Sequence, residues 1–212
     1  MVQVSSGDGG ACATLTTGQA RCWGLEPTVV LNAAGTGPLT DVAAVESAYD
    51  KTCFVLDDGQ ARCRGTYPGD GTELGGSRLA TVLNPAGTAP ETDIASIRQT
   101  EAHVCATLTT GQSRCWGPSN QFGQLGASPP SGAGSLLPVA VVDPAEGGPI
   151  TTAAEVTTGI LHTCARLLDG QARCWGLNSW GTSNAPGWGT LGDGTYAYAR
   201  YHPVPVVEPI GP

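Results

Sequence analysis

The sequence predicts an all-β, propeller-like repeat protein, and three observations support this fold class. An eleven-residue bracket that begins and ends with cysteine occurs four times in the 212-residue chain. Short stretches of alternating apolar and polar residues surround each bracket, which is typical of strands and not of helices. A repeat of this length is typical of propellers, solenoids and arrays. We therefore expect one repeat domain, 1–212, with repeats at about 1–40, 41–91, 92–151 and 152–212.

A short alternating strand is predicted at the start of each repeat. These stretches read VQVSS at 2–6, DVAAV at 41–45, DIASI at 93–97 and AAEVTT at 153–158. An apolar run closes each repeat, at 27–31, 79–83, 136–142 and 202–207. Together with the two arms of the cysteine bracket, these runs predict four short strands per repeat. The connection SGAGS at 131–135 is interpreted as a loose linker around Gly134.

The cysteine bracket is predicted to be a β-hairpin. In the first bracket Leu15 faces Gln19 across a three-residue loop that ends at Gly18, where such loops need a residue that tolerates positive φ. All four brackets carry glycine there, so the two cysteines lie directly opposite each other at a separation that a disulfide spans. Zinc is the alternative, but structural zinc sites use closely spaced pairs such as C-x-x-C. The predicted disulfides are Cys12–Cys22, Cys53–Cys63, Cys105–Cys115 and Cys164–Cys174.

Further motifs follow the hairpins. They are HVC or HTC, T-G-Q or D-G-Q, CWG, then NQFGQLG at 120–126 or LGDGT at 191–195, and a final P-x-x-V. This order resembles the repeat of the regulator of chromosome condensation family, in the cysteine-containing form found in bacterial extracellular proteins. The resemblance implies a β-propeller of four-stranded antiparallel blades that serves as a rigid scaffold for loops, and not nucleotide exchange or chromatin binding. Repeat two departs from the pattern with Arg64 in place of tryptophan, and repeat one lacks the Gly-rich stretch.

Charge and cysteine usage narrow the partners and the compartment. The chain has 18 acidic and 10 basic residues, a net charge of -8, and Lys51 as its single lysine, so nucleic acid is not an expected partner. No apolar stretch is long enough to span a membrane. Disulfides persist in oxidising compartments, which predicts an extracellular or cell-surface protein. No export signal follows Met1 in this chain.

No residue pattern predicts catalysis or a cofactor. His103 and His162 occupy the same slot, two residues before the opening cysteine, where the other repeats carry Gly10 and Lys51. A slot that accepts glycine and lysine is interpreted as a strand end. Nucleophile-elbow, zinc-protease, P-loop and dinucleotide-binding motifs do not occur in the sequence. We therefore expect a protein that is not an enzyme.

The aspartates also have a structural interpretation. Asp57, Asp58 and Asp169 fall in the hairpin turns, where aspartate favours the local backbone shape. Asp70 and Asp193 each occur in a G-D-G-T stretch without the closely spaced further ligands of a calcium loop. No metal site is expected.

Aromatic residues gather in the segment 178–202. They are Trp180, Trp188, Tyr196, Tyr198 and Tyr201. One interpretation is a longer loop that covers the edge of one blade. The other is a contact surface, because tryptophan and tyrosine anchor protein interfaces and offer flat faces to sugars.

These observations predict a non-enzymatic extracellular scaffold or binding module. An open row of four repeats would leave the apolar faces of its first and last units in water. Three arrangements would cover them: a closed ring of four blades, a pair of copies with eight blades, and an open-ended chain of subunits. Other copies of the chain are therefore the expected partner, with an extracellular protein or a glycan as further candidates. One alternative is a structural subunit of a head-to-tail filament, since a contact between unlike faces that does not close generates an open chain. The other is a protein inhibitor or glycan-recognition module that uses the aromatic segment.

Overall fold

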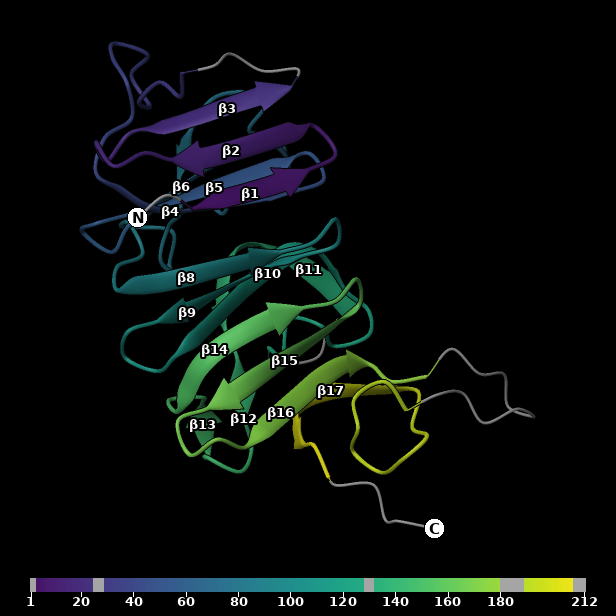
Figure 1. Ribbon diagram of the computed structural model, residues 1–212. Coiled ribbons are helices and arrows are strands. Elements are labelled where there is room, and N and C mark those ends of the chain that lie inside the picture. The colour runs from purple at the N-terminus through teal and green to yellow at the C-terminus, as the bar shows by residue number, and fades with distance from the viewer. Residues whose placement is uncertain (1–2, 25–28, 128–131, 180–188, 208–212) are drawn as a thin grey trace.

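The protein is built from β-strands. A computed structural model describes residues 3–24, 29–127, 132–179 and 189–207 (Figure 1). These ranges contain strands, turns and bends but no α-helix, and all strand pairs are antiparallel. Consequently, no helix in this part of the chain could cross a bilayer. The predicted all-β fold class is confirmed.

The described strands form four blades, each a meander in which strands that follow one another in the chain lie side by side. Blade 1 contains β1 (Val4–Gly7), β2 (Gly10–Thr14) and β3 (Ala20–Gly24), and blade 2 contains β4 (Val42–Ala48), β5 (Lys51–Leu56), β6 (Ala61–Arg64) and β7 (Ala80–Thr81). Blade 3 contains β8 (Ile94–Gln99), β9 (Val104–Leu108), β10 (Ser113–Asn120) and β11 (Gly132–Ala140). Blade 4 contains β14 (Ala153–Thr158), β15 (His162–Leu167), β16 (Ala172–Leu177) and β17 (Ala199–Pro205). A small ribbon of β12 (Val142–Asp143) and β13 (Gly148–Pro149) connects blades 3 and 4.

The fourth strand of the repeat is unequal between the blades. In blade 4 it extends over seven residues, whereas β7 of blade 2 has two. In blade 1 the position is reduced to an isolated bridge between Arg21 and Val29, beside a hydrogen bond from the Val30 amide to the Ala20 carbonyl. Of the strand predicted at 27–31, residues 29–31 are described, and there isolated bridges replace a continuous strand.

The hairpins have the predicted register and turn. The Leu15 amide donates to the Gln19 carbonyl at 2.8 Å, and Gly18 closes the loop at a φ of +77°. Each described hairpin joins its two cysteines directly across the ladder, with Cα atoms 4.0 to 4.1 Å apart. The four predicted disulfides are present, and none of the cysteines in the chain is free.

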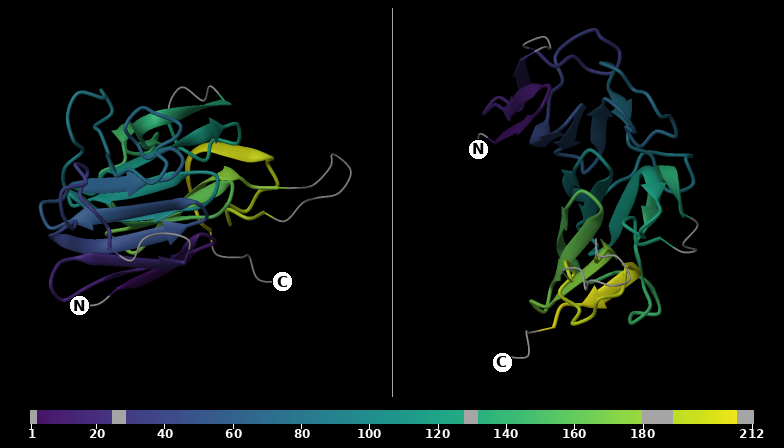
Figure 2. Two further views of the ribbon diagram at one scale, coloured as in Figure 1. Left: turned by 90° about the horizontal axis from the view of Figure 1, so that it is seen from above. Right: turned by 90° about the vertical axis from the view of Figure 1, so that its right-hand side faces the viewer.

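The blades stack along an open arc with the N-terminus at one end and the C-terminus at the other (Figure 2). The first strand of each blade packs on the first strand of the next, so β1 lies beside β4, β4 beside β8 and β8 beside β14. The core consists of three apolar clusters, one at each junction between neighbouring blades. In every cluster the disulfide of one blade packs against the first strand of the following blade. Successive strand residues point to opposite faces, so each blade has a forward face with its disulfide and a backward face.

Gly134 does not lie in a loose linker. It belongs to β11, which pairs with β10 across a register shift between Cys115 and Gly117. A Cβ at Gly134 would overlap the backbone of Gly117 and Pro118. The expectation is wrong because the close approach of two strands at a bulge leaves no periodic signal in the sequence.

Candidate functional site

Each of the two later blade junctions buries a tryptophan of the following blade in the Gly-rich loop of the preceding one. Trp116 of blade 3 donates its indole Nε1–H to the Tyr67 carbonyl of blade 2 at 3.0 Å. Trp175 of blade 4 donates in the same way to the Gln124 carbonyl of blade 3, also at 3.0 Å. Both indoles are fully buried. The burial is compatible with a polar N–H because each indole has a carbonyl partner.

Glycine is required where the loop meets the indole. A Cβ at Gly126 would lie 2.8 Å from the Nε1 atom of Trp175, and one at Gly69 would lie 3.1 Å from that of Trp116. The Asn120 side chain holds the blade 3 loop in shape by accepting the Leu125 amide at 2.9 Å. These two loops are therefore sockets for the tryptophan of the next blade.

A polar slot beside the socket also connects neighbouring blades. Lys51 of blade 2 donates from Nζ to the carbonyls of Thr100 and Glu101 in blade 3, at 2.9 and 2.6 Å. In blade 3 the ring Nε2 of His103 lies 2.7 Å from Thr163 Oγ1 of blade 4. Burial lowers the pKa of His103 to about 3, so this histidine is neutral near pH 7. The strand-end interpretation is correct for the backbone but missed that the slot joins blades.

The two ends of the arc show the same positions without a neighbouring blade. On the backward face of blade 1, Val4 is 61% exposed, whereas the equivalent Val45 of blade 2 is buried. Trp23 is 48% exposed, whereas Trp116 and Trp175 are fully buried. We call the surface around Val4 and Trp23 the first-blade face. Its side chains resemble those of an interior junction, but no blade of this chain covers them in the described ranges.

The forward face of blade 4 is the second open surface, here called the last-blade face. It contains His162 in the polar slot, the Gly-rich loop with Gly192, and Val206. Val206 is 42% exposed, whereas Val82 and Val141 at the same place in blades 2 and 3 are fully buried. The sequence shows that the residues of both faces recur in other repeats, but it does not show in which repeats they are exposed.

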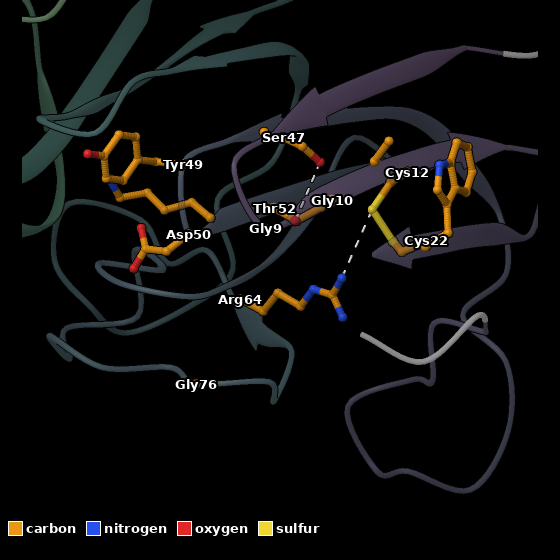
Figure 3. Close-up of a pocket in the computed structure, with 14 residues that line it drawn as sticks. Gly9, Gly10, Cys12, Cys22, Ser47, Tyr49, Asp50, Thr52, Arg64 and Gly76 are labelled. Carbon is orange, nitrogen blue, oxygen red and sulfur yellow. Dashed lines mark hydrogen bonds between the residues drawn. A yellow bond between two sulfur atoms is a disulfide. The ribbon is translucent and has the colours of Figure 1, made fainter. Parts of the chain in front are cut away.

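A cavity of about 190 Å³ lies between blades 1 and 2 (Figure 3). It occurs where repeat one lacks the Gly-rich loop and where Arg64 replaces the tryptophan of the next blade. Ser47, Asp50 and Thr52 line it together with glycine backbone, and Arg64 extends toward the disulfide, with Nη2 4.0 Å from Cys12 Sγ. The Arg64 substitution was visible in the sequence, but the cavity was not predicted.

The predicted aromatic segment is brought together in part. Tyr196, Tyr198 and Tyr201 are exposed, and Trp180 and Trp188 lie outside the described residues. The Tyr198 ring meets Phe122 of blade 3 edge-on, with centroids 5.7 Å apart. Tyr201 donates its hydroxyl to the Gln121 carbonyl at 3.2 Å. A role of these tyrosines in recognition stays a prediction.

The aspartates have local partners. Asp58 and Asp169 each accept the backbone amide two residues further on, as expected for hairpin turns. Asp70 accepts from Thr72, and Asp193 pairs with Arg200 at 2.6 Å. In the part of the chain that the structure describes, no three His, Cys, Asp or Glu side chains are grouped so that they could hold a metal ion.

Comparison with known proteins identifies the fold. No protein-family model matches the chain, and no curated protein sequence matches it significantly. Human WBSCR16 superposes with a TM-score of 0.70 at 17% identity, over 99% of this chain and 54% of that protein. Prp20p from Saccharomyces cerevisiae, described with its binding to Gsp1p and histones, has a TM-score of 0.67 at 16% identity, over 98% of this chain and 51% of that protein. Yeast RCC1 (Prp20) bound to Kap60 gives 0.67 at 15% identity, over 98% and 49%. The chain thus has an RCC1-type propeller-repeat fold and spans about half the length of these proteins.

Proposed function

We propose that this chain is a non-enzymatic scaffold and binding module outside the cytoplasm, and that it associates with copies of itself through its two end faces. The observation that carries the proposal is the exposure of Trp23, Val4 and Val206 at positions that interior blades bury. Exposed apolar positions that form a contiguous face mark interaction sites in soluble proteins. A repeat protein needs either capping units or a neighbour at such faces.

The disulfides support a location in an oxidising compartment. Four bridges clamp the hairpins, and seven of the eight cysteines are buried. Bridges of this density are typical of secreted proteins and rare in the reducing cytosol. Thiol labelling of the protein isolated from its source is the test, and eight reactive thiols would contradict the location.

Protein binding is the activity that the fold favours. The similar yeast propeller has been described bound to Kap60 and with its binding to Gsp1p and histones. Those partners belong to that protein, but they illustrate that this fold presents surfaces and loops to other proteins. For this chain the end faces carry Trp23, Val4 and Val206, which are exposed where the equivalent interior residues are buried.

A second candidate function uses the aromatic cluster of Tyr198, Tyr201 and Phe122. Tyr198 and Tyr201 are exposed, and both contact the Gly-rich loop of blade 3. Exposed tyrosines on a rigid blade edge are suited to bind a glycan, or to bind a target protein if the chain acts as a protein inhibitor. Glycan-array binding that is lost in a Tyr198→Ala variant would favour this function over self-association.

Sedimentation equilibrium over a wide concentration range tests the main proposal. We expect the average mass to rise above the chain mass of 21.5 kDa as the concentration increases. A mass that continues to rise without a plateau would indicate a head-to-tail filament, because unlike faces that do not close add subunits indefinitely. A constant mass of one chain at high concentration would refute self-association.

A further inference from the structure

The interior junctions define what a complete tryptophan socket contains. At the junction of blades 3 and 4 the carbonyl of Gln124 accepts the indole N–H of Trp175. Gly126 lies two residues later, and an ideal Cβ there would be 2.8 Å from Trp175 Nε1 and 2.9 Å from Val141 Cγ1. The junction of blades 2 and 3 repeats the arrangement with Gly69 between Trp116 and Val82. Carbonyl, glycine and valine are thus the shared parts of the socket.

The last-blade face carries the same three parts. The stretch GTLG at 189–192 matches GQLG at 123–126 residue by residue. Asn178 Oδ1 accepts the Leu191 amide at 3.0 Å, as Asn120 does for Leu125. The Val207 amide donates to the Gly192 carbonyl at 2.8 Å, which repeats the bond from Val142 to Gly126 at 2.9 Å.

Among the described residues no indole occupies this socket, and Trp180 and Trp188 lie outside them. Among the described atoms, only those of Val206 lie within 4 Å of an ideal Cβ at Gly192, the nearest at 3.1 Å. By alignment with Gln124, the Thr190 carbonyl takes the place of the indole acceptor. The socket therefore has its glycine, its valine and its acceptor backbone, and half of the Val206 side chain lies in solvent.

The matching indole is on the first-blade face. Trp23 follows the closing Cys22 as Trp116 follows Cys115, and the pairing of Ala11 with Trp23 places it in the equivalent register. Cys22 packs toward blade 2, so the next residue points to the opposite face, away from blade 2. Alternation thus places the Trp23 side chain on the backward face of β3, where it is 48% exposed, and Trp23 is also one of the residues that line the cavity between blades 1 and 2.

We propose that Trp23 of one copy docks in the socket formed by Thr190, Gly192 and Val206 of a second copy, with its Nε1–H donated to the Thr190 carbonyl. This inference rests on the proposed self-association and specifies its contact. The occupant is a second copy because that chain supplies the side chain that two interior sockets of the same design already bind. Two copies that each supply both faces would be joined by two such contacts.

The charges on the two faces are compatible with this contact. The polar slot of blade 4 holds His162, and the slots of blades 2 and 3 reach the following blade through Lys51 and His103. Lys51 meets the carbonyls of Thr100 and Glu101, and the corresponding residues of the first blade are Gly7 and Asp8. Asp8 and its carbonyl therefore oppose His162 in the proposed contact, and this pair brings no like charges together.

Light scattering of three matched variants tests the contact. The wild type should have twice the chain mass of 21.5 kDa at micromolar concentration. Trp23→Ala removes the indole and Val206→Arg fills the socket. Each should raise the dimer dissociation constant roughly a thousandfold, because an anchor residue contributes a factor of about thirty and the proposed pair has two such contacts. Leu74→Ala removes an apolar side chain that is 78% exposed on blade 2, away from both faces, and should leave the mass unchanged.

Mixing the two contact variants gives a second, positive test. The Trp23→Ala copy keeps an intact socket, and the Val206→Arg copy keeps an intact indole, so the mixture should form pairs held by one contact although neither variant pairs alone. Unchanged melting temperatures of the variants would show that they fold. If the wild type, Trp23→Ala and Val206→Arg all dimerise, the proposed contact is wrong but self-association is not. A monomeric wild type would overturn both.

Discussion

Replacing Gly111 and Gly170 by alanine separates the strain of a hairpin turn from the packing of a blade junction. Gly111 closes the hairpin loop of blade 3 and Gly170 closes the equivalent loop of blade 4, at φ values of +80° and +87°. An L-residue in this left-handed region costs about 1 to 2 kcal/mol, so that part of the destabilisation is common to the two variants. Their surroundings differ, because Gly111 is buried and Gly170 is exposed.

The packing part applies to Gly111 alone. A Cβ there would overlap the Thr151 carbonyl in the connection to blade 4, whereas no described atom lies within 4 Å of a Cβ at Gly170. The same turn also accepts the Ala153 amide at 2.9 Å through the Gly111 carbonyl, so the backbone cannot shift without loss of that bond. Overpacking of this kind costs about 1 to 3 kcal/mol. We expect Gly170→Ala to lose about 1 to 2 kcal/mol and Gly111→Ala about 2 to 5 kcal/mol.

Urea denaturation measures this difference. With a slope of about 2 to 3 kcal/mol per molar for a small protein, a difference of 2 kcal/mol separates the two midpoints by roughly 0.7 to 1 M. Equal slopes are needed for the comparison. Equal midpoints would refute the inference that the hairpin of blade 3 is packed under the connection to blade 4.

Three further predictions concern the junctions. Trp116→Ala should lower the free energy of unfolding by about 3 to 5 kcal/mol, as measured by urea denaturation, and a loss below 1 kcal/mol would contradict its burial. The pKa of about 3 for His103 lies below its ordinary value of 6.5, so its stabilisation is complete above pH 6.5 and declines as the pH falls toward 3, by about 1.4 kcal/mol per unit. His103→Gln should flatten that part of a stability profile, and an unchanged profile would exclude the histidine as its source. In a Trp23→Ala monomer, mild reductant should open Cys164–Cys174 first, because Cys164 is partly exposed and the other cysteines are buried; mass-resolved thiol labelling that finds another bridge opened first would count against the open last-blade face.

The hairpins could be predicted from the sequence because their determinants are local. Gly18 and its equivalents occupy a fixed turn position, and the cysteines that flank each turn are directly cross-strand. The fourth strands were less predictable, since similar apolar runs form strands of different length, two residues in β7 and seven in β17. Gly134 was misassigned because its constraint comes from Pro118 on another strand.

For the candidate site, the sequence shows which residues repeat but not which copies are exposed. The tryptophan after the closing cysteine is visible in three repeats, but Trp23 and Trp116 differ only in whether a blade precedes them. Exposure at the ends of a repeat array is set by the order of the units in space, which a single repeat does not encode. The cavity at Arg64 has the same origin, because it requires the absence of a loop in one blade and a substitution in the next.

The four described blades form an open arc, and we propose that the ends of two such arcs complete each other. Negative-stain electron microscopy of the wild-type protein at micromolar concentration tests it most directly. We expect particles in which two arcs are joined at both ends, and single arcs for Trp23→Ala under the same conditions. Wild-type images that contain only single arcs or compact four-blade particles would contradict it.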